Sequence, residues 1–116
     1  MEQGGDMTDR ELLELAAKAA GYDVTWLKDS QFIHDGDEWW DPLTDDGDAL
    51  RLAVRLQISI ENECVSAGCA YCTKGDVVFE PVYSGGDGSG GVVDADLSAV
   101  RRAIVIAAAS IGRDMQ

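Results

Sequence analysis

Three cysteines provide the spacing in this sequence that most resembles a metal site. Cys64, Cys69 and Cys72 follow the pattern C-x4-C-x2-C, which matches the first three ligands of a plant-type iron–sulfur cluster. No cysteine follows Cys72 to supply a fourth thiolate. The second metal option is zinc, held by these cysteines and His34, the single histidine. One isolated pair in a strand-like region is more typical of buried core cysteines, so we expect no metal and no cofactor.

A cluster of acids surrounds two tryptophans between residues 35 and 48. Seven of these fourteen residues are Asp or Glu, and none is Lys or Arg. An EF-hand calcium loop does not fit, because counting back from Gly47 places Pro42 at the first ligand position. Tryptophans anchor many interfaces, acidic rims steer basic partners, and strand alternation should bury one tryptophan and expose the other. The predicted partner-binding surface comprises Asp35, Asp37, Glu38, Trp39, Trp40, Asp41, Asp45, Asp46 and Asp48.

The sequence contains little that indicates catalysis. The sequence contains neither a nucleophile-elbow context nor a phosphate-binding G-x-x-x-x-G-K-S/T loop. A thioredoxin-like use of Cys69 and Cys72 would need a helix N-terminus beside them to lower the thiol pKa, and none is predicted there. We therefore expect a protein that is not an enzyme.

The charge balance restricts the class of partner. Twenty-two acids against nine bases give a formal net charge of −13. Direct nucleic-acid binding is not expected, because phosphate contacts need Lys and Arg to displace counterions. Such a surface can instead approach a basic protein surface, although acidity that serves solubility alone is an equally open interpretation.

No apolar run is long enough to span a membrane, and the first residues lack a secretory signal. We therefore expect no membrane association and a cytosolic setting, with reduced thiols. A chain of 116 residues fits one domain. We expect a disordered leader over 1–7 and a single domain over 8–113.

Hydrophobic periodicity and turn residues predict the order α-β-β-α-β-β-β-α. The first helix, over 8–20, opens with a capping box at Thr8 and closes at Gly21. Two or three short strands follow within 22–40. The second helix has Thr44, Asp45 or Asp46 as its cap, and its expected core face is Leu50, Ala53, Val54 and Leu56.

Three strands are then expected at 57–63, 69–73 and 77–83, followed by a mobile Gly-rich loop at 84–91. Asp94 or Asp96 would cap a last helix ended by Gly112. Its expected apolar stripe is Leu97, Val100, Ile104, Ala107, Ala108 and Ile111. The predicted fold class is α+β, a single layered sandwich in which three helices flank one mostly antiparallel sheet.

Three stretches resemble the bacteriophage ABA-sandwich domain family. They are WDPLTDDGDALRLA at 40–53, MTDRELLELAAKAAG at 7–21 and RRAIV at 101–105. The resemblance extends over nearly the whole chain from Met7, and its most specific part is the first stretch. It implies a small accessory phage or prophage protein with helices flanking a sheet, and it brings no catalytic motif.

The resemblance and the charge together suggest a counter-defence protein of the anti-CRISPR kind in the host cytoplasm. It would be a monomer or homodimer whose acidic residues block the basic nucleic-acid-binding surface of a host protein or nucleoprotein defence complex. One alternative is a sponge that sequesters a nucleotide immune signal through Arg51, Arg55, Arg101 and Arg102. The other is a structural or accessory phage protein.

Overall fold

The computed structural model describes residues 8–27, 30–33, 38–84 and 94–115. The predicted leader and most of the predicted Gly-rich loop lie outside these residues. In chain order the elements are α1 (Asp9–Ala20), β1 (Val24–Leu27), β2 (Ser30–Ile33), β3 (Glu38–Trp40), α2 (Asp46–Leu56), β4 (Ser59–Glu63), α3 (Cys64–Ala67), β5 (Cys69–Lys74), β6 (Val77–Val78), β7 (Val82–Tyr83) and α4 (Asp94–Asp114).

The fold class is α+β, as predicted. The described part contains four helices, where three were predicted, and a four-stranded antiparallel sheet. Two details differ from the prediction. Strands β1, β2 and β3 form a separate three-stranded antiparallel sheet, whereas β4, β5, β6 and β7 form the four-stranded one. An unpredicted helical turn, α3, also connects β4 to β5 and ends at Gly68, whose φ of 72° is left-handed.

Local signals set both ends of α1. Thr8 and Glu11 form the predicted capping box, with the Glu11 amide donating to Thr8 Oγ1 at 3.1 Å. Gly21, at φ 77°, ends the helix. Because these contacts involve neighbouring residues, they could be predicted without knowledge of the tertiary fold.

The predicted core face of α2 is partly wrong. Leu50 and Val54 are 58% and 69% exposed, whereas Ala49, Leu52 and Ala53 are buried. The buried positions follow the three- and four-residue spacing of one helix face, and the bulkier side chains on the neighbouring face point to solvent. The small residues allow α2 to approach α4 closely.

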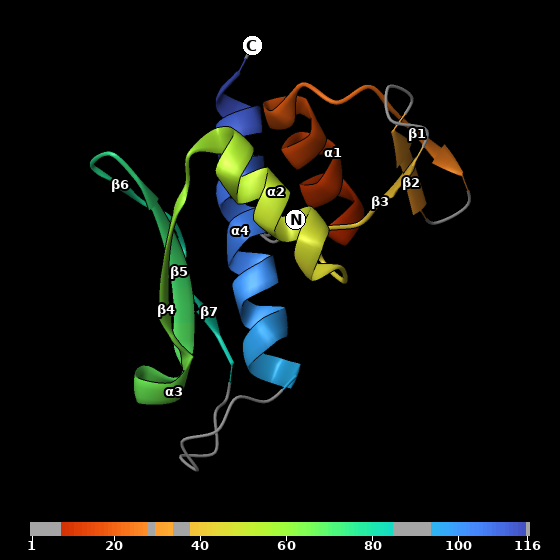
Figure 1. Cartoon of the computed structure of the whole chain (residues 1–116). Helices are drawn as coiled ribbons and strands as arrows, with labels where there is room; N and C mark the ends of the chain where they lie inside the picture. Colours follow the sequence, from red (N-terminus) through yellow and green to blue (C-terminus); the bar gives the residue numbers. More distant parts are fainter. Residues whose placement is uncertain (1–7, 28–29, 34–37, 85–93, 116) are drawn as a thin grey trace, which may run out of the picture.

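Helix α4 is the centre of the molecule. Figure 1 shows it between the four-stranded sheet on one side and α1 and α2 on the other. The expectation that helix stripes lie directly on a sheet therefore holds for α4, while α1 and α2 pack on α4 itself. Alanines at 99, 103, 107, 108 and 109 are buried on several sides of α4, whereas Leu97 in the predicted stripe is 42% exposed.

Gly112 does not end the last helix, which continues to Asp114. It lies where α4 meets α1, and a Cβ added there would be 2.0 Å from the backbone oxygen of Leu15. The glycine is required by this close approach. At the other end, Asp94 and Asp96 lie inside the first turn of α4 instead of preceding it as caps.

The predicted strand over 77–83 is divided into β6 and β7. Phe79, Glu80 and Pro81 lie between them, and proline has no amide hydrogen to donate to a neighbouring strand. Both short strands pair with β5 on the side opposite β4. This arrangement makes β5 the central strand of the four-stranded sheet.

Candidate binding surface on the four-stranded sheet

The two faces of the four-stranded sheet have different environments. In β5, Ala70 and Cys72 are fully buried, whereas Tyr71 between them is only partly buried. Their strand positions alternate, so Ala70 and Cys72 face α4 while Tyr71 lies on the opposite, outer face. Glu61 of β4 is the register partner of Tyr71 and is exposed on that same outer face.

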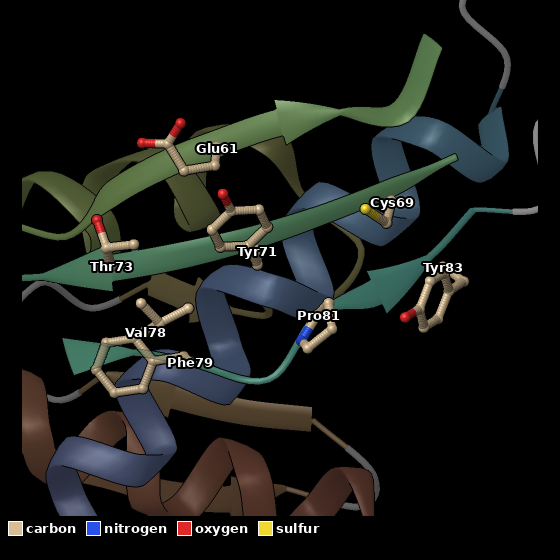
Figure 2. Close-up of a pocket in the computed structure, with 8 residues that line it drawn as sticks. All are labelled: Glu61, Cys69, Tyr71, Thr73, Val78, Phe79, Pro81 and Tyr83. Carbon is tan, nitrogen blue, oxygen red and sulfur yellow. The ribbon is translucent and has the colours of Figure 1, made fainter. Parts of the chain in front are cut away.

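The outer face contains a groove of about 460 Å³. Figure 2 shows Glu61, Tyr71 and Thr73 on the near side of the sheet, with α4 behind it. Val78, Phe79 and Pro81 continue the lining along the strands on the other side of β5. The groove therefore combines aromatic, aliphatic and anionic groups.

Hydrophobic side chains around this groove are exposed. Val78 and Tyr83, which both line it, are 67% and 75% exposed, and the neighbouring Val77 is 54% exposed. Helices α1, α2 and α4 all lie on the opposite side of the sheet (Figure 1). In the described part of the chain, no helix covers this outer face.

The electrostatic environment of the outer face is negative. The Glu63 carboxylate, partial burial and the Glu61 carboxylate raise the pKa of Tyr71 above its usual value of 10.0. Lys74 is the one basic residue between 57 and 84, and its Nζ donates to the Leu56 carbonyl oxygen at 2.7 Å. A cation approaching Tyr71 would meet carboxylates without a nearby competing lysine.

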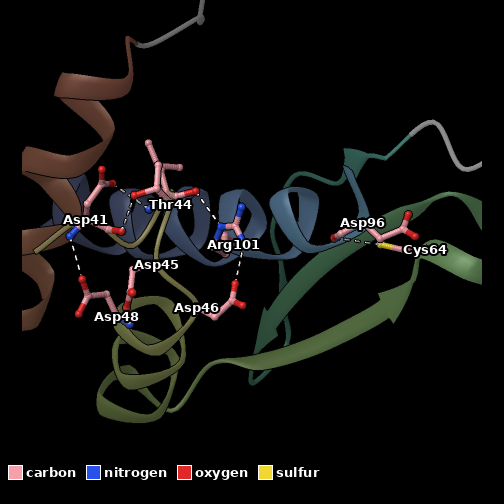
Figure 3. A network of polar contacts seen from close by, with 9 residues as sticks. Asp41, Thr44, Asp45, Asp46, Asp48, Cys64, Asp96 and Arg101 are labelled. Carbon is pink, nitrogen blue, oxygen red and sulfur yellow. Dashed lines mark hydrogen bonds and ion pairs between the residues drawn. The ribbon is translucent and has the colours of Figure 1, made fainter. Parts of the chain in front are cut away.

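The acids of the predicted surface whose side chains are described form contacts within the chain at the entry to α2. Figure 3 shows Asp48 Oδ2 accepting from the Asp41 amide at 2.9 Å. Asp45 caps the helix by accepting from the Asp48 amide at 2.8 Å, and Asp41 Oδ1 accepts from the Leu43 amide at 3.2 Å. These three carboxylates therefore have structural roles, and the cap prediction is confirmed for Asp45.

Asp46 has a side chain that is 68% exposed. It forms an ion pair with Arg101 Nη1 at 2.6 Å, and Arg101 Nε donates to the Leu43 carbonyl oxygen at 2.8 Å. Asp35 and Asp37 lie outside the described residues, and of Glu38 the structure describes only the backbone position in β3.

One tryptophan is exposed and the other is buried, as strand alternation predicts. Trp39 is 58% exposed, whereas Trp40 is 3% exposed and meets the Tyr22 ring edge-on at a centroid distance of 5.4 Å. Trp40 is therefore a core residue, and its inclusion in the predicted partner-binding surface is wrong.

The four arginines of the sponge hypothesis each contact a different part of the molecule. Arg51 pairs with Asp48 at 2.9 Å, and Arg102 pairs with Asp9 at 2.8 Å. Arg55 Nε donates to the Ala20 carbonyl oxygen, and Arg101 contacts Asp46 as described. Each contact lies at the beginning or end of α1 or α2. All four guanidinium groups therefore have partners within the chain, and they do not converge on one ligand site.

The cysteines do not converge as metal ligands would. Cys69 lines the outer groove, while Cys72 is fully buried on the inner face. Burial, with a smaller effect of the Glu61 carboxylate, raises the pKa of the Cys72 thiol to about 11. Burial also raises the pKa of Cys64, whose Sγ lies 3.7 Å from the Asp96 carbonyl oxygen (Figure 3). Within the described residues, no three His, Cys, Asp or Glu side chains form a group able to hold a metal ion.

Comparisons with protein-family models, curated proteins and solved structures find no match for this chain. The resemblance to the phage family therefore stays a prediction. None of the helices in the described ranges has the length and apolar character needed to cross a membrane.

The groove was not predicted from the sequence, although the strand alternation that contributes to it was visible there. Alternation in the predicted strands places Glu61, Tyr71 and Thr73 on one face and Ile60, Ala70 and Cys72 on the other. Which face stays open depends on the position of α4, and that follows only from the tertiary structure.

Proposed function

We propose that this chain is a non-enzymatic binding protein that occupies a basic surface of a partner protein. The observation that carries the proposal is the open groove of the outer sheet face, where Tyr71 lies beside Glu61. Open hydrophobic surface with an acidic border suits a partner that contributes both apolar contacts and positive charge. The net charge of −13 would add long-range attraction during the encounter.

The partner that best fits this chemistry is a host nucleic-acid-binding complex. The basic groove of such a complex normally binds phosphates through Lys and Arg side chains. An acidic protein bound there would pair with the same side chains and so exclude the nucleic acid. The resemblance to phage accessory proteins supports counter-defence as the setting of this activity. Inhibition would then require only binding, with no chemical step.

Capture followed by competition tests the proposal. The tagged chain is expressed in host cells that carry a CRISPR complex, recovered at low salt, and eluted with increasing salt. We expect a nucleic-acid-binding complex that elutes as salt rises, and whose nucleic-acid binding decreases when the purified chain is added. A captured complex that binds nucleic acid equally well with and without the chain would contradict the proposal.

A further inference from the structure

We infer that the outer groove holds the side chain of an arginine from an extended, basic segment of the partner protein. This inference rests on the proposed function and specifies what its binding surface recognises. Two observations carry it: an aromatic ring with a carboxylate beside it, and an apolar floor that continues away from the carboxylate.

Tyr71 and Glu61 supply the aromatic ring and the carboxylate. They are register partners on neighbouring strands, so the ring and the carboxylate lie side by side on the same face. A guanidinium group can lie against an aromatic ring and donate two parallel hydrogen bonds to a carboxylate. A lysine ammonium offers no planar surface and no paired donors, so this site favours arginine.

An apolar part of the groove lies beyond Tyr71. Val78, Phe79 and Pro81 provide apolar contacts beyond Tyr71. The three methylene groups of an arginine stem can pack there while the charged end reaches Glu61. The volume of about 460 Å³ leaves room for neighbouring partner side chains as well.

The molecule already contains this combination elsewhere. The Arg10 guanidinium lies over the Trp26 ring, 4.1 Å from its centroid, and Arg10 Nε is 3.7 Å from the Glu14 carboxylate. Arg55 lies over the Tyr22 ring at 5.1 Å. Tyr71 and Glu61 provide an aromatic ring and a carboxylate in the same way. An arginine of the partner protein would supply the guanidinium group.

A second copy of this chain is not expected to occupy the outer groove, because both copies are negatively charged there. A two-fold interface uses the same patch of both copies, so two copies meeting through this face would bring together two patches that each contain Glu61 and Glu63 and are negatively charged. Nucleic acid is disfavoured by the same carboxylates. A basic protein segment has the opposite sign and is therefore the occupant that fits.

Calorimetric titration with short synthetic peptides tests the inference. The first peptide alternates arginine and threonine, and two matched peptides carry lysine or uncharged citrulline in place of arginine. We expect the arginine peptide to bind several-fold more tightly than the lysine peptide, and the citrulline peptide to lose nearly all affinity. Equal affinity for the arginine and lysine peptides would overturn the inference.

Three variants locate the site. Glu61→Gln should weaken binding of the arginine peptide about tenfold, and Tyr71→Leu should weaken it by several-fold. Glu14→Gln removes one exposed carboxylate from α1 and should leave the affinity unchanged. Equal losses for Glu61→Gln and Glu14→Gln would mean general charge attraction and would also overturn the inference.

The inference and the proposed function fail in different ways. If the chain displaces nucleic acid from the captured complex but does not distinguish arginine from lysine, the arginine site is wrong and the proposed function stands. If the peptides behave as expected but nucleic acid stays bound, the arginine site stands and inhibition by competition is wrong.

Discussion

Two groups of acids in this molecule look alike in the sequence and differ in the structure. Asp41, Asp45 and Asp48 turn toward backbone amides around the start of α2. Glu61 and Glu63 lie on β4 beside Tyr71 and raise its pKa. The first group stabilises a helix entry, and the second makes an open face negative. Acid density alone therefore does not identify a binding surface, because a carboxylate that accepts internal hydrogen bonds is committed to the fold.

The largest expected difference between the two groups of acids is in how much their removal lowers the stability of the fold. Asp48→Ala removes an acceptor for the Asp41 amide and the ion pair with Arg51, from a side chain only 13% exposed. We expect the free energy of unfolding to fall by about 2 kcal/mol, measured by urea denaturation. Binding of the arginine peptide should be unchanged. If Asp48→Ala is as stable as the original chain but binds the arginine peptide poorly, then Asp48 has a binding role and not a structural one.

A smaller stability effect is expected at the cap of α2. Asp45→Ala should lower the free energy of unfolding by about 1 kcal/mol, because the Asp48 amide loses its acceptor. Asp45→Asn is the matched control, since asparagine caps helices equally well and should retain most of the stability. If Asp45→Asn destabilises as much as Asp45→Ala, then the charge and not the cap is responsible.

Ionisation of Tyr71 reports the negative environment directly. Ultraviolet titration, compared with a Tyr71→Phe variant, should show Tyr71 deprotonating above pH 10.0. Glu63→Gln removes the largest cause of the shift, so the pKa of Tyr71 should fall toward its usual value. Asp48→Asn should leave it unchanged. A Tyr71 pKa that is insensitive to Glu63 would contradict the negative outer face.

The smallest effect concerns a thiol in the groove. A thiol reagent should modify Cys69 in the native protein, while Cys64 and Cys72 react only on unfolding because both are buried. The arginine peptide should slow modification of Cys69 by several-fold, since Cys69 lines the same groove. The citrulline peptide provides the control. Binding without any protection of Cys69 would place the peptide elsewhere.

The parts of this fold that could be predicted depend on neighbouring residues. The capping box at Thr8, the cap at Asp45 and the opposite fates of Trp39 and Trp40 follow from short-range geometry. The strand predicted over 57–63 from hydrophobic periodicity likewise contains β4. Each of these signals lies within a few residues of the chain.

The central position of α4 could not be predicted in the same way. Its buried alanines are small and surround the helix, so they define no single stripe, and Gly112 looked like a helix end. Its true role depends on a contact with Leu15, far away in the sequence. Because the open face of the sheet is defined by where α4 packs, the groove could not be predicted either.

The most direct test compares one charge reversal in each acidic group. Glu61→Lys changes the outer face, and Asp46→Lys changes an exposed acid at the start of α2. Both variants are assayed for displacing nucleic acid from the captured complex. We expect Glu61→Lys to lose at least about tenfold in inhibition and Asp46→Lys to keep most of it. Loss with Asp46→Lys and full activity with Glu61→Lys would contradict this expectation.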